Sequence, residues 1–122
     1  MLFVSFRSWQ LRVRDIIDAA NSIQERTNGM TFEEFIDDDM VWKSVLYDFV
    51  VIGEATVNIP PEIRDRAPDV PWREMRAMRN IATHEYFQVL LEIVWGTTHN
   101  NLPSLVTSLQ ALLENANTEE EG

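Results

Sequence analysis

The stretch DMVWKSVLYDFVVIGEATVN, residues 39–58, predicts a long helix in the middle of the chain. Its apolar residues recur at three- and four-residue steps, at Val41, Val45, Leu46, Phe49, Ile52 and Val57. This spacing places them on one face of a helix, where they can pack into a core. Gly53 would permit another helix to approach closely. Glu54 beside it would need a partner such as an arginine if it were buried, and we interpret it as support for a dimer interface or a cleft.

Clear helix signals also lie upstream of this stretch. Residues 8–27 carry apolar side chains at the same spacing, with Ser8 as an N-cap and Gly29 as a stop. Thr31 opens TFEE, a capping box that predicts a short helix. The acidic run Asp37–Asp39 suits the start of the long helix, where negative charge is favoured. A cation site is the less favoured interpretation of that run.

Prolines divide the second half of the chain. Pro60-Pro61 ends the long helix, and one helical turn is expected over 61–67. A helix over about 71–84 comes next, followed by a turn or break. The last helix is expected over about 91–115, with a kink or break at Pro103.

These elements predict an all-α fold, a bundle of four main helices with additional short ones. The sequence contains no alternating strand pattern of useful length and no internal repeat. We expect one domain over 1–116, followed by an acidic flexible tail over 117–122.

Charge and composition restrict the function classes. The chain has 122 residues, a formal net charge of −10 and no cysteine. Disulfide and thiolate chemistry are therefore excluded, and indiscriminate binding to nucleic acid is disfavoured. No apolar run approaches the roughly 20 residues that span a bilayer, so we expect no membrane association and a cytoplasmic location.

Positive charge is concentrated in one segment of this acidic chain. Five of the ten basic residues lie within 64–79, namely Arg64, Arg66, Arg73, Arg76 and Arg79. Three acidic residues oppose them there, so five minus three leaves the segment at +2. Arginine binds phosphate through a planar fork of donors. The pattern fits either a phosphate-binding surface or a helix face covered by salt bridges.

The segment RNIATHEY, residues 79–86, combines side chains suited to cleaving RNA. Histidine can move a proton near neutral pH, and arginine can stabilise charge on a phosphate. An amide can fix the imidazole tautomer, and tyrosine can stack on a base. On an α-helix Asn80 and His84 share a face, as do Arg79 and Thr83, whereas Arg79 and His84 lie about 140° apart. The plainer interpretation is a capped helix end with a surface pair.

The other histidine adds no second site. His99 lies in the polar stretch TTHNN and is expected to be solvated or to cap a helix. The two histidines are too far apart in sequence for a common ligand spacing, and no cysteine is present, so neither a metal nor another cofactor is expected. The tryptophans, including Trp72 after a proline, are interpreted as core or interface anchors.

The chain resembles the HepT-like toxins of the HEPN superfamily over about residues 7–113. The similar segments occur in the family's order: RSWQLRVRDIIDA (7–19), MTFEEF (30–35), IGEA (52–55), PDVPWREM (68–75), MRNIATHEYFQV (78–89) and LEIVW (91–95). The family motif is Arg, a polar residue, three more residues, His, any residue and Tyr. All of its residues are present here.

The resemblance implies a function and a site. It implies a homodimeric, metal-independent ribonuclease that is the toxin of a toxin–antitoxin pair. Arg79 and His84 would be the catalytic pair and Asn80 the orienting polar residue. Tyr86 would accept AMP from an antitoxin, a minimal nucleotidyltransferase of the MntA type. Arg73 and Arg76 are expected to contact the RNA.

The resemblance leaves one alternative open and shows one departure. The alternative is a non-catalytic HEPN module that binds nucleotide, RNA or a nucleotidyltransferase partner. The departure is Leu90, where many relatives have an aspartate N-cap before LEIVW. We therefore expect a looser start of the last helix and a less fixed position for Tyr86.

Overall fold

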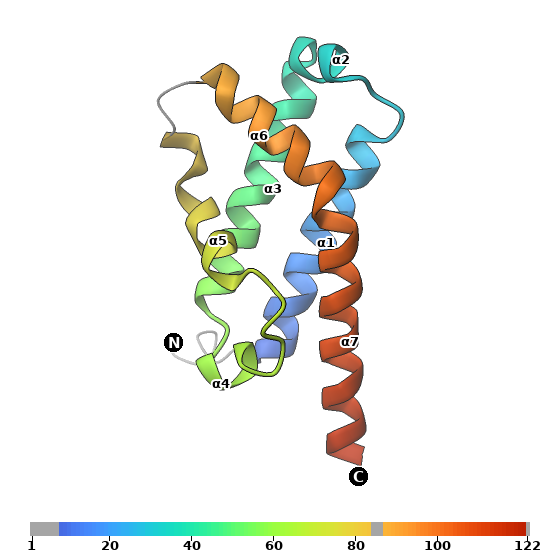
Figure 1. Cartoon of the computed structure of the whole chain (residues 1–122), viewed down its shortest axis with the longest axis vertical. Coiled ribbons are helices and arrows are strands. Elements are labelled where there is room, and N and C mark those ends of the chain that lie inside the picture. Colours follow the sequence, from blue (N-terminus) through green and yellow to red (C-terminus); the bar gives the residue numbers. More distant parts are fainter. Residues whose placement is uncertain (1–7, 84–86, 122) are drawn as a thin grey trace, which may run out of the picture.

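The computed structural model describes the backbone of residues 8–83 and 87–121, and the side chains of 8–81 and 87–116. His84 and Tyr86 lie outside the described residues. The long helices are α1 (Trp9–Thr27), α3 (Asp39–Val57), α6 (Phe87–Asn100) and α7 (Leu102–Glu121), as Figure 1 shows. The short ones are α2 (Phe32–Asp37), α4 (Pro61–Arg64), α5 (Trp72–Ala77) and the 3₁₀ helix η2 (Met78–Thr83). These ranges contain no strand, so the predicted all-α fold is confirmed.

Side-chain caps fix three helix starts where the sequence predicts them. The Leu11 amide donates to Ser8 Oγ at 3.4 Å at the start of α1. The capping box of α2 is complete, because Glu34 N donates to Thr31 Oγ1 at 3.1 Å and Thr31 N donates to Glu34 Oε1 at 2.9 Å. At α3, Val41 N donates to Asp38 Oδ1 at 3.2 Å. The acidic run Asp37–Asp39 therefore lies at the start of α3, with Asp38 as the N-cap.

The second half of the chain differs from expectation at two helix boundaries and agrees with it at a third. The helix predicted over 71–84 is an α-helix only to Ala77 and then tightens into η2. Helix α6 begins four residues earlier than predicted, at Phe87 rather than at 91. The expected break near Pro103 is confirmed, since α6 ends at Asn100 and Pro103 lies in the first turn of α7, where its missing N–H leaves no hydrogen bond unmade.

Two further predictions concern the helix start near Leu90 and the C-terminal segment. Leu90 is inside α6 and only 2% exposed, so the helix begins before this position and not at it. Burial of its side chain stabilises the turn that precedes LEIVW. The looser helix start and the less fixed position of Tyr86 stay predictions, because residues 84–86 lie outside the described residues. Helix α7 continues to Glu121 and so includes most of the segment assigned to a tail. The flexibility of that segment stays a prediction.

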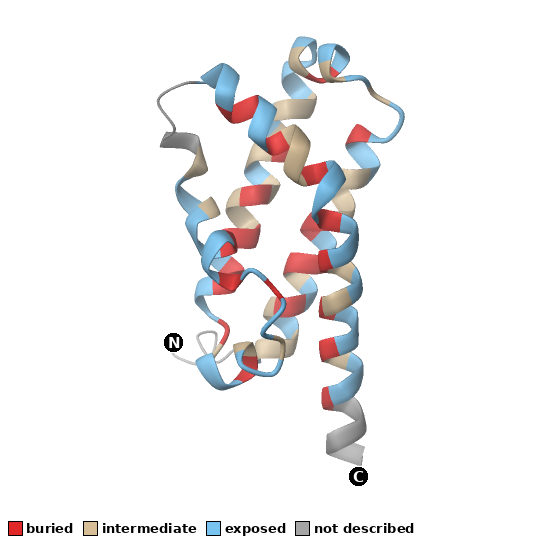
Figure 2. Ribbon diagram, in the orientation of Figure 1, coloured by how far each residue is buried: buried red, intermediate tan, exposed pale blue. Residues whose placement is uncertain are grey.

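The core lies between α1 and α3 and is closed by α6 and α7 on one side and by α5 on another. Figure 2 shows the buried residues of α1 and α3 turned toward this interior. The largest fully buried side chains come from six different helices and a loop: Val13, Ile16, Ile23, Phe35, Val45, Phe49, Ile52, Ile59, Met75, Val94, Leu102 and Leu109. None of the helices in the described part of the chain is both long enough and apolar enough to cross a membrane.

Aromatic side chains attach the first turns of α5 and α6 to this core. Trp72 at the start of α5 is 8% exposed, and its indole N–H is shared by the Arg64 carbonyl at 3.2 Å and the Ala67 carbonyl at 3.0 Å. This confirms Trp72 as a core anchor and fixes the loop before α5. Trp42 on α3 meets the Phe87 ring edge-on, with centroids 4.7 Å apart, so the first turn of α6 packs against α3.

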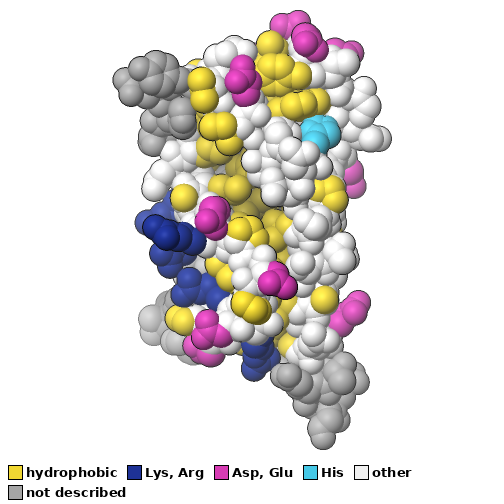
Figure 3. Space-filling view, in the orientation of Figure 1, with side chains coloured by type: hydrophobic (Ala, Val, Ile, Leu, Met, Phe, Trp, Pro, Cys, Tyr) yellow, Lys and Arg dark blue, Asp and Glu magenta, His cyan; other side chains and the backbone are white. Residues whose placement is uncertain are grey.

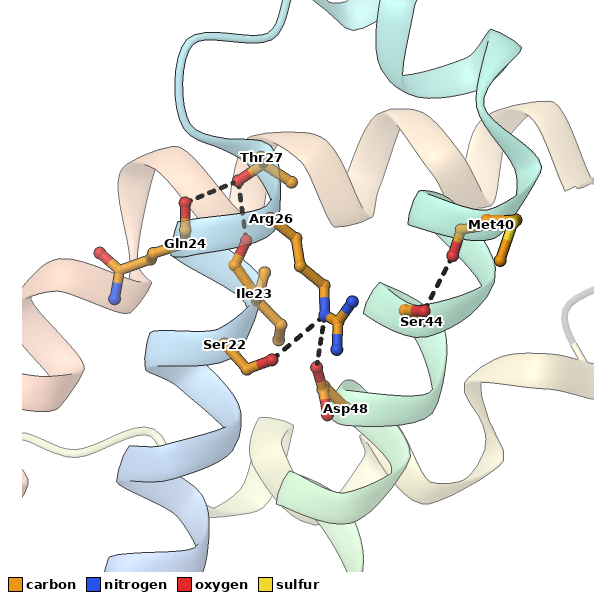
Figure 4. Close-up of polar contacts among 8 residues, drawn as sticks. All are labelled: Ser22, Ile23, Gln24, Arg26, Thr27, Met40, Ser44 and Asp48. Atoms are coloured by element: carbon orange, nitrogen blue, oxygen red, sulfur yellow. Dashed lines mark hydrogen bonds and ion pairs between the residues drawn. The ribbon is translucent and has the colours of Figure 1, made fainter.

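A polar contact also joins α1 to α3, as Figure 4 shows. Arg26 Nε donates to Ser22 Oγ at 3.2 Å and lies 3.9 Å from Asp48 Oδ2. Burial raises the pKa of Asp48 above its ordinary value, although the Ser22 hydroxyl and the Arg26 charge act in the other direction. This cluster is partly buried and lies on the α1–α3 seam, so we assign it a structural role.

Gly53 permits a close approach between α3 and η2. A Cβ on Gly53 would lie 2.9 Å from Arg79 Cα and would clash with the Arg79 amide nitrogen. The backbone of η2 therefore rests directly on α3, as the sequence predicts for this glycine. Only a residue without a side chain fits here.

We predict that Gly53→Ala destabilises the protein by roughly 1–3 kcal/mol, because the added methyl group must push η2 away from α3. Urea unfolding measures the change. Gly96→Ala is the matched control, since Gly96 is also helical and its Cβ would meet only Asn100 Nδ2 at 4.0 Å. That variant should gain up to about 1 kcal/mol from helix propensity. Equal effects of the two substitutions would contradict the packing described here.

Candidate functional site

Three arginines of the RNIATHEY region line one surface cavity. The cavity has a volume of about 320 Å³, and its walls are Val57, Arg73, Arg76, Ala77, Arg79 and Asn80. Arg73 and Arg76 also line a second cavity of about 510 Å³, together with Arg64 and Trp72. Figure 3 shows dark blue side chains gathered along this edge of the molecule, over α4 and α5. We call the first of these the arginine cavity.

The change of helix type helps to form this row. Arg73, Arg76 and Arg79 are spaced by three residues, and all three are exposed. On an α-helix such a row drifts around the axis, whereas on a 3₁₀ helix residues three apart eclipse. Helix α5 changes to η2 at Met78, before Arg79. The tighter turn therefore limits the drift of the row, and Val57 at the end of α3 forms the facing wall.

The arginines of the cavity are not neutralised by carboxylates. Across 8–81 and 87–116, Arg73, Arg76 and Arg79 make no ion pair, and the pairs that do occur in these ranges include Arg26–Asp48 and Lys43–Asp39. Within these ranges, the structure therefore gives no support to a helix face covered by salt bridges at these three residues. Arg66 differs, because it does make a polar contact. Three cations close together at a surface, without a carboxylate partner among the described residues, form a ready site for an anion.

Asn80 lies at the centre of the site. It is exposed, makes a polar contact, and lines both the arginine cavity and a neighbouring apolar cavity. The sequence analysis missed the two small apolar residues of the arginine cavity, Val57 and Ala77. Neither carries a chemical group that a motif would reveal; only the fold shows that they form its walls.

The angle around the helix axis between Arg79 and His84 cannot be calculated from α-helix geometry. The offset of about 140° assumed continuous α-helix, but Met78–Thr83 is a 3₁₀ helix with about 120° per residue. The α-helical angles expected within this segment therefore do not apply over Met78–Thr83. His84 and Tyr86 are outside the described residues, so their roles rest on the sequence motif and stay predictions.

Glu54 is not buried, so the case in which it would need a buried partner does not arise. It is exposed on α3, and its backbone carbonyl accepts from Asn58 Nδ2 at 3.0 Å. Its neighbours Gly53 and Ala55 are both buried. Glu54 thus needs no arginine partner within the protomer, and its assignment as dimer or cleft support stays a prediction.

His99 has the structural role expected from the sequence. It is exposed in the last turn of α6, where its Nδ1 lies 2.8 Å from the Trp95 carbonyl and its ring packs 4.2 Å from the Trp95 indole. No group of three or more His, Asp or Glu side chains suited to a metal occurs among the described residues. His99 therefore caps and packs α6, far from the arginine cavity in sequence.

Comparison with known proteins identifies the family. The model of the family described as "Ribonuclease HepT-like" matches residues 16–112. The chain is 36% identical over 106 residues to "Probable ribonuclease HepT" of Thermococcus cleftensis, covering 87% of this chain and 96% of the relative. It is 34% identical over 107 residues to "Putative RNase MJ0127" of Methanocaldococcus jannaschii, covering 88% of each chain.

The likeness extends over nearly the whole domain. A third relative, "Putative RNase TTE0752" of Caldanaerobacter subterraneus subsp. tengcongensis, is 33% identical over 99 residues, which cover 81% of this chain and 88% of the relative. No solved structure matches this chain significantly. The matched region contains α3, the arginine cavity and the RNIATHEY motif. The chain belongs to the HepT-like ribonuclease family.

Proposed function

We propose that this protein is a metal-independent RNA endonuclease and the toxin of a toxin–antitoxin pair. The observation that carries the proposal is the row of Arg73, Arg76 and Arg79 around one cavity of a HepT-like ribonuclease fold, with no ion pair to any carboxylate among the described residues. A polyanion is the natural ligand of such a row in a chain whose net charge is −10. The named ribonucleases among the relatives support RNA as that polyanion.

RNA supplies its own nucleophile in the proposed reaction. The ribose 2′-oxygen attacks the adjacent phosphorus, the bond to the 5′-oxygen breaks, and a 2′,3′-cyclic phosphate remains. His84 takes the proton from the 2′-hydroxyl or gives one to the departing 5′-oxygen. Arg79 stabilises the negative charge that builds on the phosphate oxygens. We assign Asn80 to orienting the imidazole, and Arg73 and Arg76 to holding neighbouring phosphates.

A homodimer would place two such sites in one groove. Two arginine cavities facing each other would double the local positive charge and offset the acidic background. In that arrangement Arg79 of one protomer can serve the phosphate beside His84 of the other. This assembly is what the resemblance to HepT-like toxins implies.

Control of the toxin is assigned to Tyr86. An MntA-type nucleotidyltransferase antitoxin would transfer AMP from ATP to the Tyr86 oxygen; the phenol loses its proton and pyrophosphate leaves. The attached phosphate can then bind Arg79 and Arg76 and occupy the charge that RNA needs. The chain keeps its fold, and the site is blocked by a covalent mimic of the substrate.

The second candidate function is a non-catalytic HEPN module that binds nucleotide, RNA or a nucleotidyltransferase. The same arginines would support binding without cleavage. The intact Arg79–His84 pair favours the enzyme, because binding alone requires no proton-transfer group. Cleavage of RNA by the purified protein separates the two.

For catalysis, we predict that Arg79→Ala and His84→Ala each reduce RNA cleavage by at least about 100-fold, through loss of charge stabilisation and of proton transfer. Gel analysis of RNA incubated with purified protein in EDTA provides the measurement. Arg14→Ala is the matched control, since Arg14 is exposed on α1 and lines neither arginine-containing cavity. Full cleavage by His84→Ala, or a requirement for added Mg²⁺, would reject the mechanism.

For assembly, we predict that mixing the inactive Arg79→Ala and His84→Ala proteins restores activity. If the pair acts across the dimer, a mixed dimer contains one intact site and recovers up to about a quarter of the wild-type rate, because half of the dimers are mixed and each has one of two sites. Light scattering should show a dimer at micromolar concentration. An active monomer would contradict the shared groove, and a dimer without restored activity would place the pair within one protomer.

For control, co-expression with a nucleotidyltransferase of the MntA type should add one or more AMP masses to the wild-type protein and abolish cleavage. Tyr86→Phe lacks the acceptor oxygen and should gain none. Intact mass spectrometry provides the readout, and Tyr47→Phe is the control because Tyr47 is the other tyrosine and is 68% exposed on α3. Modification of Tyr86→Phe, with loss of its activity, would place the acceptor elsewhere.

A further inference from the structure

An apolar cavity lies directly beside the arginine cavity. It has a volume of about 420 Å³, and its apolar walls come from Phe49, Met78, Ile81, Ile93 and Val94. It separates η2 from α6, and Figure 3 shows hydrophobic side chains in this central hollow of the face. A volume of this size lies within the range of small-molecule sites, roughly 300–1,000 Å³. None of these apolar residues has a role in the proposed cleavage.

The two cavities share a low ridge. Ala77 and Asn80 line both of them. A ligand bound in one cavity can therefore reach the other by passing over the Ala77 methyl group and the Asn80 side-chain amide. Arginines on one side of the ridge suit a phosphate, and the apolar walls on the other suit a flat aromatic ring. A nucleotide has both parts, joined by a ribose. The arrangement therefore matches one nucleotide of a bound RNA strand.

The polar groups of the apolar cavity restrict which base fits. Glu74 on α5 is exposed and lines the cavity, and its carboxylate makes no hydrogen bond or ion pair across residues 8–81 and 87–116. A carboxylate only accepts hydrogen bonds. Guanine offers two adjacent donors, N1–H and the N2 amino group, on its Watson–Crick edge. Uracil offers one donor between two carbonyl oxygens, which a carboxylate repels.

We propose that this cavity is a nucleobase subsite and that Glu74 makes it prefer guanine. The inference rests on RNA as the substrate of the adjacent arginine cavity. Thr97, which lines the cavity from α6, supplies a hydroxyl that can donate to guanine O6. Adenine and cytosine each place a ring nitrogen acceptor beside their amino donor and fit a carboxylate less well. The subsite thus gives the nuclease a sequence preference at one position.

Methyl NMR of the full chain, labelled at Ile and Met, tests the proposal without requiring cleavage. Guanosine 3′-monophosphate should shift the methyl signals of Met78, Ile81 and Ile93 and bind about tenfold or more tightly than uridine 3′-monophosphate. Inorganic phosphate should leave these signals in place. Equal affinity for the two nucleotides, or no shift of these methyl groups, would overturn the proposal.

Paired variants identify the groups responsible. Glu74→Gln should bring guanosine monophosphate affinity close to that of uridine monophosphate, whereas Glu92→Gln should not, since Glu92 is exposed on α6 outside the cavity. Ile93→Glu should abolish the methyl shifts, and Val89→Glu should retain them, because both residues are exposed on α6 and only Ile93 lines the cavity. Unchanged guanosine affinity in Glu74→Gln would remove that residue from the proposal.

The outcome also separates this proposal from the ribonuclease function. A protein that cuts RNA but shows no guanosine-dependent shift keeps its function and loses the subsite. A protein that binds guanosine monophosphate as described but cuts no RNA keeps the subsite and loses the ribonuclease assignment.

Discussion

The contact between Gly53 and the backbone of Arg79 is the constraint on which the site depends. It lets η2 lie against α3 without an intervening side chain. Helix α3 belongs to the core through Val45, Phe49 and Ile52, so η2 is tied to a core helix of the bundle. A site built on packed helices keeps its geometry better than one on a free loop. The position of the arginine row thus follows from the absence of one side chain.

This placement explains how an acidic protein can attract RNA. Among the described residues, the arginines of the cavity make no ion pair with a carboxylate, whereas Asp38 caps a helix and Asp48 lies on the α1–α3 seam. At physiological salt, exposed charges act mainly within about 8 Å, so the local row matters more than the distant negative charge. The same row would bind the phosphates of RNA or the phosphate of an attached AMP group. It would also hold the phosphate of the nucleotide whose base lies in the neighbouring subsite.

Local signals predicted the parts of the fold that depend on local chemistry. At Ser8, Thr31 and Asp38 a side chain accepts a hydrogen bond from a nearby backbone amide. The helix starts at these positions can be predicted because the residues that form them are neighbours in the sequence. The tightening into η2, the early start of α6 and the exposure of Glu54 depend on packing with distant elements. The sequence identified the arginines but not Val57 and Ala77, since a cavity wall has no motif. His84 and Tyr86 were identified from the motif alone.

The central claim is that close packing of η2 on α3 holds the arginine row in its active position. The most direct test is the rate of RNA cleavage by Gly53→Ala at a temperature where circular dichroism shows it folded, with Gly96→Ala as the control. Our account predicts that Gly53→Ala loses at least about tenfold in rate while Gly96→Ala stays near wild type, because a shift of about 1 Å at a site can cost that much or more. A folded Gly53→Ala protein with the full wild-type rate would contradict it.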